Sequence, residues 1–175
     1  MPFPLPPPLA GTGAVPPPRN RDLTALLTAY EQVMGWTVAV EGLRVPGTDA
    51  ADTLRRRPDS MVSVVCIGFE ALQLPARPGG PPVPVLELDD RLYCGDLVVP
   101  SFVTGSGART LLVRPDTAEE VSRVRGWPMI GVGGELVVPP SPGMRWEIPP
   151  WDPARRAPLA FPDAALVARD SPPPP

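Results

Sequence analysis

The sequence contains no histidine and no lysine, and its only cysteines are Cys66 and Cys94. The lack of histidine excludes Ser-His-Asp and Cys-His catalysis and imidazole metal ligands. The lack of lysine excludes a Walker A lysine and Schiff-base chemistry. Two cysteines are too few for a disulfide scaffold and lack the spacing of a metal site, so buried, unreactive thiols are expected.

Long hydrophobic runs are also missing. No stretch approaches the roughly 20 apolar residues that cross a membrane. Residues 1–18 have neither the charged region nor the continuous apolar region of a signal peptide. The net charge of -3 provides no general attraction for a phosphate backbone. We therefore expect a cytoplasmic protein with no membrane partner, in which any contact with DNA or RNA depends on a local arginine cluster.

Proline, in contrast, is abundant, with 30 residues among 175. It is densest at the two ends, residues 1–19 and 169–175, which are predicted to be disordered, Pro-rich arms because proline fixes φ and removes a backbone donor. PxxP spacings such as Pro4 to Pro7 are typical of ligands for aromatic grooves, so the arms offer one route to a protein partner. The alternative is a plain disordered tail. The length between the arms suits one folded domain, residues 20–168.

Helix-like and strand-like segments alternate irregularly between the arms. Apolar residues recur at helical spacing over 23–34, with Gly35 placed to end the helix. Asp116 and Glu119 resemble a capping box that opens a helix to about Arg125. Residues 127–138 are typical of a hairpin around Gly133 and Gly134. Further helices are predicted over 50–56 and from 162 or 163 to about 169, and further strands over 36–40, 61–67, 84–89, 93–99, 110–114 and 144–148.

These segments predict a single α+β or mixed α/β domain with three or four helices. Residues 70–74 fit neither a helix nor a strand clearly. Trp36, Trp127, Trp146 and Trp151 are expected to pack in the core rather than to stack on bases.

The most acidic patch lies at the end of the predicted strand 84–89. Residues two apart share a face of a strand, so Glu87 and Asp89 would project together. A pair of carboxylates on one face is what a two-metal nucleotidyl-transfer site needs to hold Mg²⁺ or Mn²⁺. Such a site requires a third carboxylate, for instance Asp96 or Asp116. The alternative is a solvated strand end that runs into a turn.

The only dense basic run is Arg55, Arg56 and Arg57. Arginine suits bidentate contacts with phosphate, so the run is a candidate nucleic-acid contact. The alternative, which we favour, is the solvated end of a helix, where cations complement the helix dipole.

Several segments in a fixed order carry a resemblance to a known family. They are AYEQVMGWTVAV (29–40), CIGFEALQLP (66–75), RTLLVRPDTAEEV (109–121), GVGGELVVPPS (131–141) and MRWEIPP (144–150). Together they resemble the bifunctional DNA primase/polymerase N-terminal (prim-pol) family, especially short, divergent stand-alone members from Streptomyces and related actinobacteria. The likeness covers roughly residues 24–168. It implies the archaeo-eukaryotic primase fold, an α+β domain with a mainly antiparallel, RRM-like sheet.

The resemblance also implies a catalytic set that this chain does not match. Active members use two or three metal-binding carboxylates and a Ser-x-His motif, and this sequence has no histidine. Glu70 stands where one carboxylate is expected, but Gln73 is neutral where a second acid is expected. Asp89 or Asp96 would have to supply a later carboxylate. The resemblance therefore implies a catalytically inactive relative that binds nucleic acid or protein and needs no cofactor.

Two other functions remain open at this stage. One is an active, Mg²⁺- or Mn²⁺-dependent primase/polymerase that uses Glu70, Glu87, Asp89 and Asp96. The other is an interaction or regulatory adaptor that uses the Pro-rich arms and has no link to nucleic acid.

Overall fold

The computed structural model describes residues 20–74, 98–152 and 154–169, with side chains from residue 23 onward. These ranges contain four helices and eleven strands, and every strand pairing among them is antiparallel. The predictions of an α+β fold, of three or four helices and of a mainly antiparallel arrangement are confirmed. The strands divide among two larger sheets and one two-stranded ribbon.

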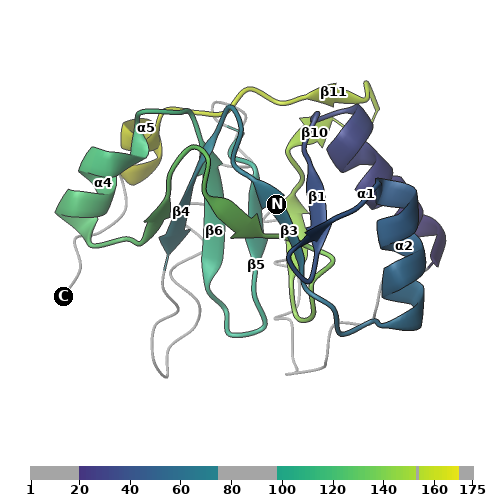
Figure 1. Ribbon diagram of the computed structural model, residues 1–175. Helices are drawn as coiled ribbons and strands as arrows, with labels where there is room; N and C mark the ends of the chain where they lie inside the picture. Colours follow the sequence, from purple (N-terminus) through teal and green to yellow (C-terminus); the bar gives the residue numbers. More distant parts are fainter. Residues whose placement is uncertain (1–19, 75–97, 153, 170–175) are drawn as a thin grey trace, which may run out of the picture.

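The first sheet has the strand order β2-β1-β3-β8. Helices α1 and α2 pack against each other beside it, on the right of Figure 1. Helix α1 ends as predicted, because Gly35 adopts φ +67°, a left-handed conformation that favours glycine. The elements are α1 (Asn20–Gln32), β1 (Val38–Val40), β2 (Leu43–Arg44), α2 (Gly47–Arg56), β3 (Val62–Val65) and β8 (Glu135–Val137).

The second sheet has the order β7-β4-β6-β5-β9. Helices α4 and α5 lie together on the opposite side of the molecule from α1 and α2 (Figure 1). The elements are β4 (Glu70–Leu74), β5 (Ser101–Val103), β6 (Arg109–Val113), α4 (Ala118–Arg125), β7 (Met129–Ile130), β9 (Arg145–Ile148) and α5 (Ala164–Ala168), with the separate ribbon β10 (Trp151–Asp152) and β11 (Ala157–Pro158).

The predicted hairpin over 127–138 is wrong. Strand β7 pairs with β4, and β8 pairs with β3, so the two strands belong to different sheets. The turn between them crosses the corner where β3 continues into β4. There the N–H of Cys66 donates to the carbonyl of Gly134, and the N–H of Gly133 donates to the carbonyl of Cys66. A glycine turn looks the same in the sequence whether its flanking strands pair with each other or with distant partners.

Helix α2 begins at Gly47, three residues before the predicted start. The N–H of Gly47 donates to the Oε1 atom of Glu31 on α1 at 2.7 Å, so the first turn is stabilised by a partner outside the local sequence.

None of the helices in the described ranges combines the length and the apolar character that a membrane span requires.

Aromatic side chains fill the space between α1 and the sheets. Tyr30 is fully buried, and its ring lies 5.6 Å from that of Trp36 and 6.3 Å from that of Trp146. The Tyr30 hydroxyl donates to the carbonyl of Pro139 and accepts the indole N–H of Trp146 at 2.7 Å. Burial is the main reason that the pKa of Tyr30 lies far above its usual value. The hydroxyl therefore serves as a neutral link between α1, the loop at Pro139 and strand β9.

Changing Tyr30 to Phe is expected to lower the free energy of unfolding by about 2 kcal/mol. The ring would stay in place, but the carbonyl of Pro139 and the indole N–H of Trp146 would each lose a partner in a buried setting. Urea denaturation followed by tryptophan fluorescence measures the change. A loss below about 0.5 kcal/mol would show that the hydroxyl contributes no more than an exposed group does.

Candidate functional site

Glu70 is the one carboxylate assigned by the resemblance that the structure describes. It lies at the start of β4, only 6% exposed. Its Oε2 atom accepts the backbone N–H groups of Thr117 at 3.2 Å and Ala118 at 3.0 Å. These groups belong to the first turn of α4, which leaves its N–H groups without partners inside the helix. Glu70 therefore caps α4 from a distant strand.

The capping box predicted from Asp116 and Glu119 is not formed. The residue at the N-cap position of α4 is Thr117, and its side chain makes no capping hydrogen bond. Asp116 adopts φ +61° instead, a conformation that is uncommon outside glycine. The partner that replaces it, Glu70, is 47 residues away from Thr117 in the sequence, so local spacing could not reveal it.

Burial and the nearby Glu70 carboxylate also determine the protonation state of the Cys66 thiol. Cys66 is fully buried, as expected, and burial followed by the charge of Glu70 raises its pKa to about 11. A thiol with this pKa is protonated at neutral pH and is a poor nucleophile. Among the residues described, no three His, Cys, Asp or Glu side chains are grouped so that they could hold a metal ion.

Three other acidic candidates, Glu87, Asp89 and Asp96, lie outside the described residues, as does Cys94. The metal site on Glu87 and Asp89 therefore stays a prediction.

The arginine run lies at the end of α2, where the favoured interpretation put it. Arg55, Arg56 and Arg57 are all exposed. Arg55 forms an ion pair with Asp52 and donates to the Oγ1 atom of Thr24 on α1. Neither of the next two arginines forms an ion pair within the described ranges. Those two guanidinium groups are the ones available to an outside phosphate.

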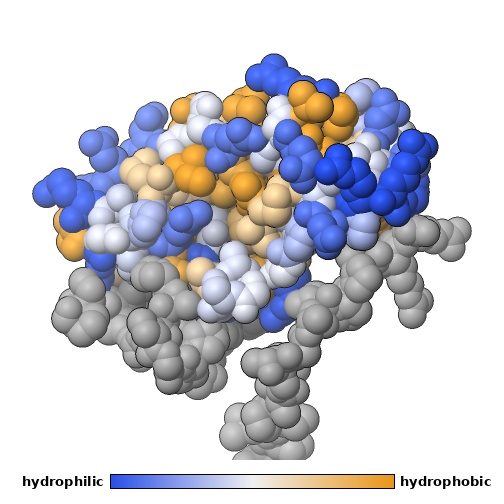
Figure 2. Space-filling view, turned by 60° about the horizontal axis from the view of Figure 1, so that its bottom comes forward, coloured by the Kyte–Doolittle hydropathy of each residue, from blue (hydrophilic) through white to orange (hydrophobic). Residues whose placement is uncertain are grey.

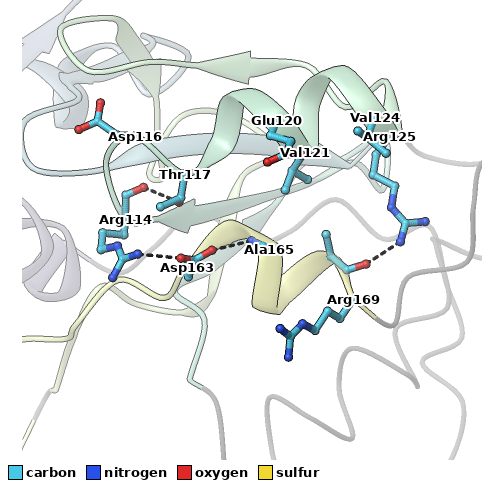
Figure 3. A pocket seen from close by; sticks show the side chains of 11 residues that line it. Arg114, Asp116, Thr117, Glu120, Val121, Val124, Arg125, Asp163, Ala165 and Arg169 are labelled. Carbon is cyan, nitrogen blue, oxygen red and sulfur yellow. Dashed lines mark hydrogen bonds and ion pairs between the residues drawn. The ribbon is translucent and has the colours of Figure 1, made fainter.

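A hollow of about 570 Å³ lies between α4 and α5 (Figure 3). Its two helices are 38 residues apart in the sequence, and nothing in the local pattern of either indicated it. Apolar side chains and arginines share the lining, and carboxylates stand at one side. The lining residues are Arg114, Asp116, Thr117, Glu120, Val121, Val124, Arg125, Asp163, Ala165, Ala168 and Arg169.

Polar contacts join the surroundings of α4 and α5 at both ends of this hollow. At one end, the Nη2 atom of Arg114 lies 2.7 Å from the Oδ2 atom of Asp163, and the Oδ1 atom of Asp163 accepts the N–H of Ala165. The predicted start of this last helix near 163 is confirmed. At the other end, the Nη2 atom of Arg125 donates to the carbonyl of Ala168 at 2.8 Å.

A second charged pair, which the sequence did not indicate, is buried in the sheet. Arg109 on β6 lies 2.7 Å from Glu147 on β9, and their side chains are 7% and 18% exposed. The strand between them is β5, which is bulged against β9 between Ser101 and Phe102. Ser101, fully buried nearby on β5, has a hydroxyl with no hydrogen-bond partner among the residues that the structure describes.

Apolar surface by itself does not single out a site. Figure 2 shows hydrophobic residues gathered across the middle of one face, with hydrophilic residues around them. Exposed apolar side chains are common on soluble proteins, so this face alone identifies no partner. The large hydrophobic side chains that are exposed in the described ranges are Leu43, Met61, Ile67, Val98, Val124, Val132 and Leu166.

Comparison with known proteins gave no match to a protein family, to a curated protein or to a solved structure.

Proposed function

We propose that the chain is a prim-pol-like domain that binds nucleic acid and does not polymerise nucleotides. The observation that carries the proposal is the position of Glu70. The carboxylate that the resemblance assigns to a metal is instead buried and caps α4.

Nucleotidyl transfer needs several carboxylate oxygens that face the same two metal ions. The Oε2 atom of Glu70 already accepts two N–H groups, and the side chain is closed off from solvent. The absence of histidine removes the Ser-x-His motif that active relatives use on the nucleotide. Both features support binding without catalysis.

The binding contacts are assigned to Arg56 and Arg57 at the end of α2. Both are exposed and form no ion pair within the described part of the chain, so their donors are available to phosphate. The net charge of -3 opposes long-range attraction. We therefore expect weak association that depends strongly on salt.

A paired assay at low salt tests this function. Purified protein is mixed with primed and unprimed DNA templates, nucleotides and Mn²⁺, and the same DNA is used for gel shifts. We expect no incorporation and a shift that disappears as salt rises. Changing Arg56 and Arg57 together to Ala should weaken the shift. The slope of log K against log salt concentration should become less steep by up to about 2, since each phosphate contact contributes about 1 to that slope. Arg123→Ala, an exposed change on α4, is the matched control.

Two outcomes would overturn the proposal. Incorporation that is lost on changing Glu87 and Asp89 to Ala would establish an active nucleotidyltransferase. The absence of both incorporation and a gel shift would exclude nucleic-acid binding and favour the adaptor. For an adaptor, deletion of residues 1–18 should abolish partner binding and leave the fold intact.

A further inference from the structure

The hollow between α4 and α5 exists because small residues face it. Helix α5 contributes Ala165 and Ala168, which occupy little volume, opposite Val121 and Val124 on α4. The result is an open groove with an apolar floor. Its volume of about 570 Å³ falls within the range of small-molecule sites. Val124, at its edge, is 61% exposed, so an apolar ligand would cover surface that now faces water.

One end of the groove carries positive charge that no described acid neutralises. Arg125 is half-buried, and among the described residues its side chain donates to a neutral carbonyl, that of Ala168, which leaves several of its donors available. Arg169, the next residue after Ala168, is exposed and lines the same hollow. Both residues lie at the helix C-termini that form this end. In Figure 3 the Arg125 guanidinium stands beside the end of α5, whereas the Arg169 side chain extends away from it, below α5.

The opposite end has a different electrostatic character. There Arg114 is paired with Asp163, so its charge is balanced. Asp116 and Glu120 lie near the start of α4 and add negative charge. In Figure 3, Asp116 and Arg125 stand at opposite sides of the groove. An elongated ligand with one charged end would therefore be held in one direction.

We propose that this groove binds an organic anion, with the head group at Arg125 and an apolar body over Val121, Val124, Ala165 and Ala168. The planar fork of arginine matches the oxygens of a carboxylate or a phosphate. Cations near helix C-termini also complement the helix dipoles, so the dipoles alone would account for arginines at positions 125 and 169. The dipole does not explain why the helices leave an open apolar hollow beside them. The proposal is independent of nucleic-acid binding at α2.

Isothermal titration calorimetry of the full chain with octanoate and with octyl phosphate, both below their micellar concentrations, tests the proposal. Octylamine is the matched cationic probe, and acetate and inorganic phosphate lack the apolar body. We expect saturable binding of at least one of the two octyl anions, and at least 10-fold weaker binding of the other three probes. Ala165→Leu, on an exposed helical position, should fill the groove and abolish binding.

Charge variants separate a head-group contact from general apolar binding. Arg125→Gln should weaken binding of the octyl anion at least 10-fold, whereas Arg123→Gln, outside the groove, should leave it unchanged. Thermal unfolding of each variant checks that the fold is retained. No detectable binding of either anion, equal binding of octylamine, or affinity that is insensitive to Arg125→Gln would each overturn the proposal.

Discussion

Changing Glu147 to Ala is expected to lower the free energy of unfolding by about 3 kcal/mol, since it removes the carboxylate that lies against a buried charge. Arg109 is almost completely enclosed, and its side chain meets the Glu147 carboxylate at 2.7 Å. The guanidinium group cannot lose its charge at accessible pH. Urea denaturation, with the slope of the transition checked for two-state behaviour, measures the loss.

A double-mutant cycle shows whether this loss belongs to the pair. Arg109→Met, Glu147→Met and the double change of both residues to Met make up the cycle. We expect the double variant to be more stable than Glu147→Ala, because two apolar side chains leave no charge buried. Arg155→Ala is the control, since that arginine is 84% exposed and lies 3.5 Å from Asp152. Its effect should stay below about 1 kcal/mol. Equal losses at both sites would contradict a special role for burial.

Changing Glu70 to Ala is expected to lower the free energy of unfolding by about 2 kcal/mol. The loss of a helix cap costs about 1 kcal/mol, and a buried N–H without a partner adds about as much again. Both donors are affected, and Ala118 is fully buried. Glu119→Ala is the matched control, because Glu119 is an exposed acid in the first turn of the same helix. The free energies of unfolding of the two variants, measured by urea denaturation, should differ by more than about 1 kcal/mol. Equal values would show that Glu70 does not cap α4.

Elements with a local signal could be predicted from the sequence. The helical spacing of Leu23, Leu27 and Tyr30 placed α1, and all three are buried. Asp163 caps α5 through the N–H of Ala165, two residues away, so the contact lies within reach of a sequence pattern. The strand predicted over 110–114 corresponds to β6 with a shift of one residue.

Features that depend on distant residues could not be predicted. The cap of α4 comes from β4, and the start of α2 is bonded to α1. Residues 70–74 gave no clear pattern, because a strand paired on both sides and buried on both faces does not alternate. The groove between α4 and α5 arises only when the second sheet and its helices assemble.

The role expected from the sequence and the role seen in the structure differ most for Glu70. A family resemblance assigns its carboxylate to a metal, while the structure uses it to hold the first turn of α4. These roles make opposite demands on stability. Acidic residues grouped around a metal repel one another, so neutralising one often stabilises the protein. A carboxylate that caps a helix is stabilising, so neutralising it should destabilise the protein.

The most direct measurement is the thermal unfolding of Glu70→Gln and wild type, each with and without Mn²⁺. Glutamine keeps the shape and one acceptor oxygen but loses the charge. The account predicts a loss of about 1 kcal/mol, or a Tm lower by about 3 °C, and any shift caused by Mn²⁺ should be the same in both proteins. A Tm that is unchanged or higher, together with a Mn²⁺ response lost in the variant, would contradict the account and assign Glu70 to a metal site.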